Sequence, residues 1–306
     1  MRQGMSGRNK TLSQNAKQKI EKDRVELSEF APPVFVVCFV TCIFVSAMLT
    51  YQLWYVNRAL GTQMSSLREV REQTQGGIAV VFDDEPQEAS EEHIKTLPQA
   101  EMLYDMKQLY EQNSDLIGWL YVEDTNIDYP VMQTPEDENY YLERDFQKNY
   151  NSNGSLIMDT DSVVGSGTAA NAYADGTKPG TNLIIHGHNM KNGNMFGSLD
   201  KYRDINYEKK HNIIKFSSLY EHREYEVVSV FLSQVYLKTQ TDVFKFYQFF
   251  QADTEKEFSN FYNNIKELAL YDTGVSAEFG DEFITLSVCT YHVENGRLVV
   301  VAKRIK

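Results

Sequence analysis

The chain has 306 residues and a formal net charge of −13, with 24% of its residues charged. Its length suffices for one well-packed domain with appendages. The acidic balance argues against binding to nucleic acid, because phosphate backbones bind basic surfaces and no basic, aromatic-rich patch occurs in the sequence. Cys38 and Cys42 share one apolar segment, so Cys289 stands alone and a disulfide framework is excluded.

An apolar segment near the N-terminus predicts a membrane anchor. Residues 30–56 contain no charged side chain, and about 20 apolar residues suffice to cross a bilayer as a helix. Pro32 stands at its entrance, and Trp54 and Tyr55 stand at its far end, as interfacial aromatic residues do. A cleaved signal peptide is the alternative, but the segment is long for one and no clear Ala-x-Ala cleavage site follows.

The charges beside this segment predict its orientation. Residues 1–29 carry seven Lys and Arg against four Asp and Glu, whereas only Arg58 lies beyond the segment before Arg68. The positive-inside rule therefore predicts a cytoplasmic tail over 1–29 and places everything after about residue 57 outside. We expect a single-pass protein of the cell membrane with an acidic external part.

Beyond the anchor, the sequence divides into a linker and a domain. Residues 57–97 are polar, which predicts an extracellular stalk with a partly helical start near 65–74. Residues 98–306 form the predicted domain. Its first segment, 99–113, places four apolar residues on one helical face and predicts a docking helix.

The rest of the domain alternates short strand-like segments with few helices. Apolar residues at helical spacing predict one helix over 253–270. This pattern predicts a mainly β domain, an antiparallel or mixed barrel. The predicted strands cover 117–122, 127–132, 155–159, 182–186, 213–216, 224–235, 283–289 and 297–305.

A loop rich in Gly, Ala and Ser is predicted over 161–180. Its pair Gly165-x-Gly167 lacks the rest of a dinucleotide fingerprint, and no Gly-Lys-Ser/Thr follows, which argues against a phosphate site. Asp159 and Asp161 lack further oxygen ligands at suitable spacing. We therefore expect neither a metal site nor a cofactor.

Cys289 ends one predicted strand, and Arg297 opens the next. The connection ends in the turn-prone pair Asn295-Gly296, so a hairpin would bring both side chains to one rim of the sheet. Arg304, at roughly 3.3 Å per residue, would lie about 23 Å from that rim, which leaves Arg297 as the candidate partner. A cysteine nucleophile needs a base or cation nearby and a donor for the oxyanion that its attack creates.

Two of the six histidines suit the role of the base. His186 and His188 follow a buried-strand run that ends in a small turn, a setting that presents an imidazole at a rim. The others lie in the linker, in charged surroundings or in a loop that no strand fixes; they are His93, His211, His222 and His292. The residues alone leave the choice between His186 and His188 open.

Together these features resemble the sortases, membrane-anchored cysteine transpeptidases of Gram-positive bacteria, and most of all class B. The resemblance covers about residues 98–306 and rests on the TLSxC motif at Thr285–Cys289, the strand-end Arg297 and the motif His186-Gly187-His188. The predicted helix between late strands is a class B trait. Further matches are DLIGWL at 115–120, IDYPV at 127–131, YYL at 140–142, GSLIMD at 154–159 and NGNMF at 192–196.

The resemblance implies a fold and a set of site residues. The fold is a sortase-like closed β-barrel of about eight strands with an N-terminal helix. The catalytic residues are Cys289 as nucleophile, His188 as acid and base, and Arg297 as oxyanion or substrate donor, while His186 stands where the family often has tyrosine. Thr285, Ser287 and Thr290 are expected to line the substrate groove, with the Thr290 N–H as a second oxyanion donor.

One position departs from the class B pattern. Members often carry aspartate two residues after the cysteine, whereas this chain has Tyr291. This departure argues against an aspartate-based triad here.

The resemblance also implies partners. These are secreted proteins with a C-terminal sorting signal, cleaved after Thr through a thioacyl-enzyme, and an amine acceptor from a peptidoglycan precursor or a pilin lysine. The sequence does not distinguish anchoring of haem-uptake proteins from pilus assembly.

Two other functions fit the same residues less well. A papain-like cysteine protease would have its cysteine before its histidine and at the start of a helix, whereas here His188 precedes Cys289 and both end strands. An anchored, non-catalytic binding module would hold Cys289 as an inert thiol. Thiol labelling distinguishes an enzyme from such a module.

Overall fold

The computed structural model describes residues 5–75, 100–168, 173 and 175–306, and within the first range the side chains from residue 35 onward. The chain forms two compact units, Met1–Arg58 and Ala59–Lys306. The region predicted as a flexible linker lies largely outside the described residues.

The first unit is helical. Helix α1 runs over Met5–Gln75, and its part Phe35–Gln73 is long and apolar enough to cross a membrane, with a mean hydropathy of 2.0 in its most apolar window. Large apolar side chains from Phe35 to Tyr55 are exposed. Such a surface is suited to lipid, although length and composition alone carry this interpretation.

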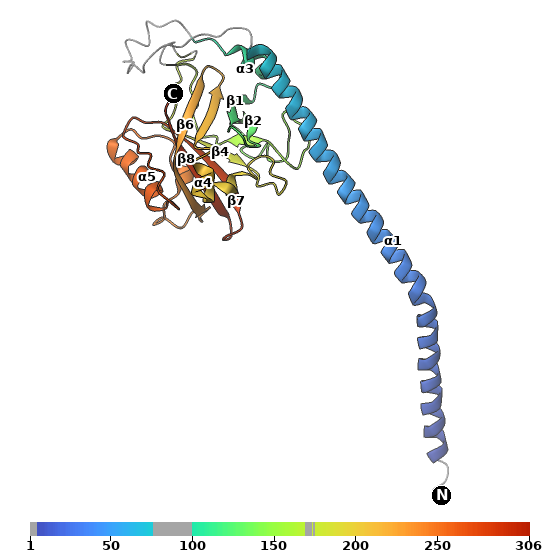
Figure 1. Ribbon diagram of the computed structural model, residues 1–306. Coiled ribbons are helices and arrows are strands. Elements are labelled where there is room, and N and C mark those ends of the chain that lie inside the picture. The colour runs from blue at the N-terminus through green and yellow to red at the C-terminus, as the bar shows by residue number, and fades with distance from the viewer. Residues whose placement is uncertain (1–4, 76–99, 169–172, 174) are drawn as a thin grey trace. The chain divides into compact units, whose positions relative to one another are not determined.

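The second unit contains a closed barrel of eight strands in the order β1-β2-β3-β4-β7-β8-β6-β5 (Figure 1). Pairing is antiparallel except for β2 with β3 and β4 with β7. The predicted mixed barrel is confirmed. The strands are β1 Leu116–Tyr121, β2 Asp128–Met132, β3 Leu156–Met158, β4 Asn182–Gly187, β5 Ile213–Ser218, β6 His222–Gln234, β7 Phe283–Thr290 and β8 Gly296–Arg304.

Alternation along the late strands gives the barrel two apolar faces. In β7, Ile284, Leu286 and Val288 belong to the main core, whereas Phe283 belongs to a second cluster that includes Phe258. Both faces of these strands are therefore buried over most of their length. This double burial explains their nearly continuous apolar sequence.

The second cluster is covered by helix α5, Glu255–Glu267, which comes between β6 and β7 in the chain. Figure 1 shows it outside the barrel. A capping box begins it: the Thr254 side chain accepts from the Glu257 N–H, and the Glu257 side chain accepts from the Thr254 N–H. Phe258, Phe261 and Ile265 form its buried face. The helix predicted over 253–270 is confirmed with shorter ends.

The part of α1 inside the second unit packs on the barrel. Leu60, Met64 and Leu67 are buried, and Arg68 pairs with Asp128 at 2.6 Å. The sequence predicted a stalk over 57–97, but residues 59–75 belong to the compact unit. The missed signal is the spacing of Leu60, Met64 and Leu67, because apolar residues at i, i+4 and i+7 mark a docked helix face.

The predicted docking helix is present as α3, Tyr104–Gln112, with Met106 and Leu109 fully buried. Three shorter helical turns complete the fold. They are η1 Leu199–Arg203, α4 Ile205–Glu208 and η2 Phe246–Gln248.

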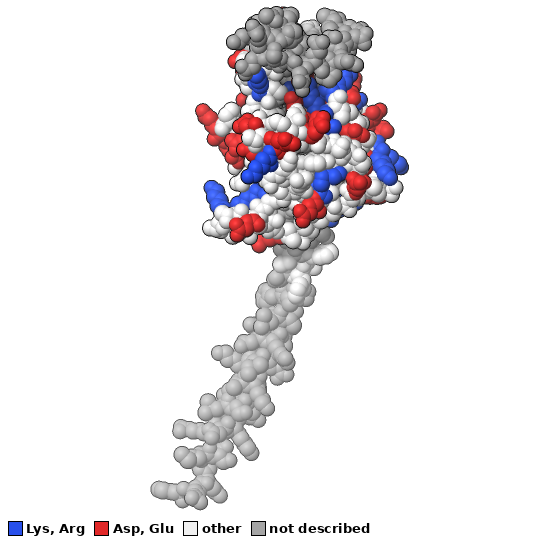
Figure 2. Space-filling view, turned by 90° about the vertical axis from the view of Figure 1, so that its left-hand side faces the viewer, with Lys and Arg blue, Asp and Glu red and all other residues white. Residues whose placement is uncertain are grey.

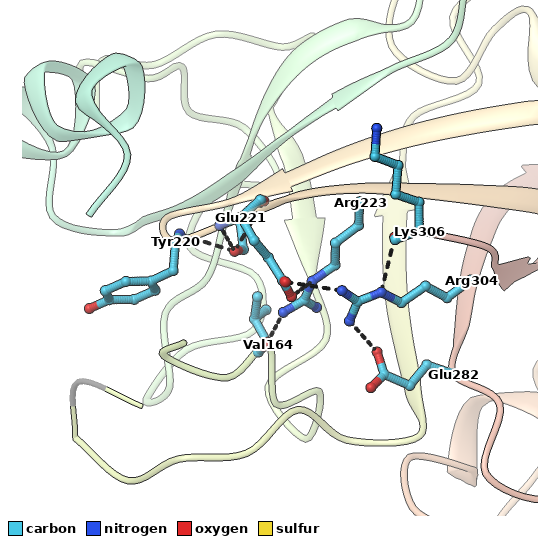
Figure 3. A network of polar contacts seen from close by, with 8 residues as sticks. Val164, Tyr220, Glu221, Arg223, Glu282, Arg304 and Lys306 are labelled. Carbon is cyan, nitrogen blue, oxygen red and sulfur yellow. Dashed lines mark hydrogen bonds and ion pairs between the residues drawn. The ribbon is translucent and has the colours of Figure 1, made fainter. Parts of the chain in front are cut away.

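An ion-pair network lies at the C-terminal end of β8. Figure 3 shows the Glu221 carboxylate between the guanidinium groups of Arg223 and Arg304, with Glu282 on the far side of Arg304. Arg223 also donates to the Val164 carbonyl at 2.8 Å. The network therefore ties two strands to the start of the loop over 161–180.

Charged side chains of both signs lie on the face of this unit that Figure 2 shows. On the face in Figure 2, Lys and Arg are interspersed with Asp and Glu. Such a mixed surface keeps a protein soluble without forming a single-sign field.

Candidate active site

The candidate nucleophile lies where β7 leaves the barrel core. Cys289 is exposed, whereas the six residues before it in β7 are buried. In the antiparallel ladder Cys289 is the direct partner of Arg297 on β8. Side chains of directly opposed residues leave the sheet on the same side, with Cβ atoms about 4.5–5.5 Å apart. The hairpin predicted from the sequence is present.

The neighbouring strand on the other side of β7 carries the histidines. Strands β4 and β7 are parallel, and their last paired residues are Gly187 and Val288. His188 and Cys289 come directly after this pair, so both leave adjacent strands at the same edge of the sheet. The structure thus brings the three predicted catalytic residues to one rim.

Asn189 connects these two strand ends beyond their last backbone pair. Its side-chain amide donates to the Cys289 carbonyl at 2.9 Å. The backbone beside it is also fixed, because the Phe196 N–H donates to the His188 carbonyl and Asn189 bridges with Met195. The sequence analysis did not identify Asn189, since this contact joins residues 100 positions apart.

The imidazole of His188 has a defined partner. Its Nε2 lies 2.7 Å from the Leu142 carbonyl oxygen. A carbonyl oxygen can only accept, so Nε2 carries a hydrogen in this contact, and in the neutral ring Nδ1 is then the basic nitrogen. The bond orients the ring and selects its tautomer.

The Leu142 carbonyl is itself held in place by tight packing and a polar network. Gly154 adopts a φ of +60°, and a Cβ there would lie 2.3 Å from the Leu142 oxygen. The adjacent Tyr141 donates its hydroxyl to Asp115 at 2.7 Å. Burial raises the pKa of Tyr141 well above its ordinary value, so the hydroxyl stays protonated as a donor.

Glycine between the two histidines is required by close packing. A Cβ at Gly187 would lie 2.6 Å from the Phe196 ring and 2.7 Å from Leu156. Contacts that short force the neighbours to move. Gly187 therefore allows the chain to turn from His186 to His188 against Phe196.

The two histidines have different surroundings. His186 is the Cα partner of Ser287, and its Nε2 lies 3.3 Å from Asp159 Oδ2. His186 therefore lies within strand β4, two residues before His188 and beside Ser287. Only His188 follows the last strand pair next to Cys289.

The three residues expected to line the substrate groove are largely buried. Thr285 is fully buried and donates to Asn182 at 2.8 Å, which is a structural contact. Ser287 is 2% exposed, and its Oγ has no partner among the described residues. The Thr290 hydroxyl hydrogen-bonds the His292 ring. Substrate contact by these residues stays a prediction, which the burial of Thr285 does not support.

Arg297 and Arg304 lie at opposite ends of β8, as predicted from their spacing. The Arg297 guanidinium donates to the carbonyls of Asn295 and Gly296, at the start of the strand. Arg304 instead pairs with Glu221 and Glu282. Arg297 is therefore the arginine at the rim, and Arg304 stabilises the far end.

Other charged or polar candidates near the rim show no metal-binding arrangement. Within the described residues, no group of three or more His, Cys, Asp or Glu side chains could hold a metal ion. Tyr291, at the position where class B sortases often carry aspartate, is 88% exposed.

Comparison with known proteins places this geometry in a family. The sortase domain family matches residues 120–305. Sortase B of Listeria monocytogenes is 29% identical over 227 residues, which cover 74% of this chain and 84% of that protein. Sortase B of Staphylococcus aureus is 28% identical over 221 residues, which cover 71% and 78%. A crystal structure from Bacillus anthracis, described as similar to sortase B, superposes with a TM-score of 0.59 at 28% identity and covers 83% of this chain and 97% of that one.

Proposed function

The chain belongs to the sortase family as a class B transpeptidase, and on this premise we propose that it cleaves the sorting signal of secreted proteins after Thr and transfers them to an amine. The acceptor is a peptidoglycan precursor or a pilin lysine. The observation that carries the proposal is the register that puts Arg297 opposite Cys289 and His188 beside it. An exposed thiol with a histidine at the end of one adjacent strand and an arginine on the other is suited to acyl transfer.

In the first half-reaction, the Cys289 thiolate attacks the carbonyl carbon of Thr, in the amide bond between Thr and the next residue of the sorting signal. The C–N bond breaks, and a thioester forms on the sulfur. His188 in its imidazolium form gives its proton to the leaving amine. The Leu142 carbonyl, which accepts from Nε2, leaves Nδ1 as the nitrogen that exchanges this proton.

In the second half-reaction, the acceptor amine attacks the thioester carbon. Neutral His188 takes a proton from the attacking nitrogen, the C–S bond breaks and the Cys289 thiolate is regenerated. A new amide therefore replaces the old one, and the two half-reactions balance without a cofactor. Water in place of the amine would give hydrolysis.

Arg297 stabilises the charge that develops on the carbonyl oxygen in both steps. Its guanidinium is always charged, and β8 holds its backbone in register with Cys289. The Thr290 N–H is the second donor in the proposal. Removing one oxyanion donor typically costs on the order of 10²–10³ in rate.

The N-terminal helix anchors the enzyme in the membrane in this proposal. The apolar part of α1 is suited to a single crossing, and the positive charge over 1–29 favours an N-terminus in the cytoplasm. The domain then faces the cell wall and its secreted substrates. The tail over 1–29 and the anchor over 30–56 stay predictions from the sequence, while the compact unit that contains the barrel begins at Ala59.

Intact-mass analysis of reaction products tests the proposal. The full chain in detergent micelles is incubated with a library of sorting-signal peptides and with cell-wall-like amines or a lysine peptide. The proposal predicts a peptide acyl group on Cys289, followed by a product that joins the peptide to the amine. Peptide products that end in a free Thr carboxylate, with no product that joins the peptide to any of the amines, would indicate a hydrolase instead.

A further inference from the structure

Asn189 links the candidate base to the backbone of the candidate nucleophile. It follows His188 directly, and its side-chain amide donates to the Cys289 carbonyl at 2.9 Å. The backbone ladder between β4 and β7 ends at Gly187 and Val288. The amide therefore supplies a cross-strand bond at the point where backbone pairing has stopped.

We propose that Asn189 is a positioning residue, which fixes the spacing between His188 and Cys289 by tying the two strand ends together. The proposal rests on the catalytic roles proposed above. A hydrogen bond from the residue next to His188 to the backbone of Cys289 constrains both partners at once. Misplacement of a reacting group by about 1 Å can cost up to on the order of 100-fold in rate, so a single tether at this point matters.

Other contacts hold the loop after His188 without reaching Cys289. The Phe196 N–H donates to the His188 carbonyl at 3.0 Å. The Asn126 amide donates to the Gly193 carbonyl at 3.2 Å. Asn126 thus also donates its side-chain amide to a backbone carbonyl, but to one within the loop and not to Cys289, so it provides a control for Asn189.

The distinction from a merely structural role lies in coupling to His188. If Asn189 only stabilised the loop, its loss would lower the melting temperature, and its effect on Cys289 would not depend on His188. If it positions His188 against Cys289, its loss changes the reactivity of the thiol only while the imidazole is present. A double-mutant cycle measures this dependence directly.

The experiment measures the alkylation rate of Cys289 by iodoacetamide at pH 7. The full chain is used in detergent micelles, and mass spectrometry of the peptide containing Cys289 separates it from the other cysteines. The variants are Asn189→Leu, which keeps the branched shape but removes the donor, His188→Ala, their combination, and Asn126→Leu. Melting temperatures are recorded for all of them.

The proposal predicts that Asn189→Leu slows alkylation on the order of tenfold, while Asn126→Leu leaves the rate within about twofold at a similar melting temperature. In the His188→Ala background, Asn189→Leu has no further effect. An unchanged rate in Asn189→Leu, or an equal slowing with and without His188, would overturn the inference. If His188→Ala itself leaves the rate unchanged, the catalytic pair fails, and the proposed function falls with it.

Discussion

Cys289 and Arg297 are direct partners across the β7–β8 ladder, so two paired strands bring these two residues to one rim. Their relative position is set by backbone pairing over the whole hairpin. The Arg297 guanidinium in addition donates to the carbonyls of Asn295 and Gly296 at the end of the connection. This arrangement resembles an engineered site, in which functional groups on strands are placed more accurately than groups on loops.

Replacing Arg297 with alanine should reduce turnover without affecting folding. We expect transpeptidation to fall by about 10²–10³ because one oxyanion donor is lost. Arg297→Lys should also lose most activity, since a point charge does not reproduce the geometry of the guanidinium. The two readouts are turnover of a sorting-signal peptide that the wild-type enzyme cleaves, and the melting temperature.

Arg304→Ala is the matched control on the same strand. Its side chain is 23% exposed and pairs with two carboxylates, so its removal should cost about 2–3 kcal/mol and lower the melting temperature by several degrees. Turnover of the folded enzyme should stay within about twofold. Near-normal turnover in Arg297→Ala, or a collapse of turnover in Arg304→Ala, would count against the assignment.

His188 and His186 should respond differently to substitution. His188→Ala removes the acid and base, and we expect a loss of about 10²–10⁴ in turnover. His186→Ala removes the contact of His186 with Asp159, which does not involve Cys289, and should change turnover by less than about tenfold. Parallel rate measurements on the two variants check this order, and the reverse order would transfer the catalytic role to His186.

Much of the barrel could be predicted because its local patterns agree with its tertiary structure. The run that precedes Cys289 has apolar residues at alternate positions, the run that follows Arg297 is almost wholly apolar, and Asn295-Gly296 marks the turn between them. The hairpin and its rim therefore follow from sequence. Such agreement between local and global preferences is typical of natural folds.

Other parts of the site could not be predicted because they depend on distant contacts. The Leu142 carbonyl that orients His188 is a backbone group 46 positions away, and any residue could supply it. The constraint on Gly154 arises from its approach to that same oxygen. Sequence patterns report side-chain types, so a backbone acceptor leaves no pattern of its own.

The docked part of α1 should contribute to the stability of the catalytic unit. Leu67 is 2% exposed, and Leu67→Ala should cost about 2–3 kcal/mol because it leaves a cavity. The melting temperature should fall by about 4–12 °C for a unit of this size. Ser66→Ala, an exposed change on the same turn, should leave it nearly unchanged; equal melting temperatures for both variants would mean that this helix does not belong to the folded unit.

The Asp115 network should make stability depend on acid pH. Burial alone would raise the pKa of Asp115, but hydrogen bonds from Lys148 and Tyr141 outweigh it and lower the pKa below its ordinary value of 3.8. The ionised carboxylate therefore stabilises the fold above about pH 3.8, and this contribution disappears as the pH falls through the lower folded-state pKa. Asp115→Asn should melt several degrees lower at pH 7.

The gap between wild type and Asp115→Asn should then narrow below about pH 4, as the wild-type carboxylate becomes protonated. Melting curves from pH 7 to pH 3 provide the measurement. Asp124→Asn, which changes an exposed carboxylate, should show no such gap at any pH. A difference that stays constant down to pH 3 would show that Asp115 acts through packing and not through its charge.

The most direct test of the account is the mass of the full chain after brief exposure to an intact sorting-signal peptide that the enzyme cleaves, without acceptor amine. We predict an acyl adduct on Cys289 that disappears when the amine is added, and no adduct in Cys289→Ala. An adduct that persists in Cys289→Ala, or turnover by that variant, would contradict the central claim that this sulfur carries the acyl group.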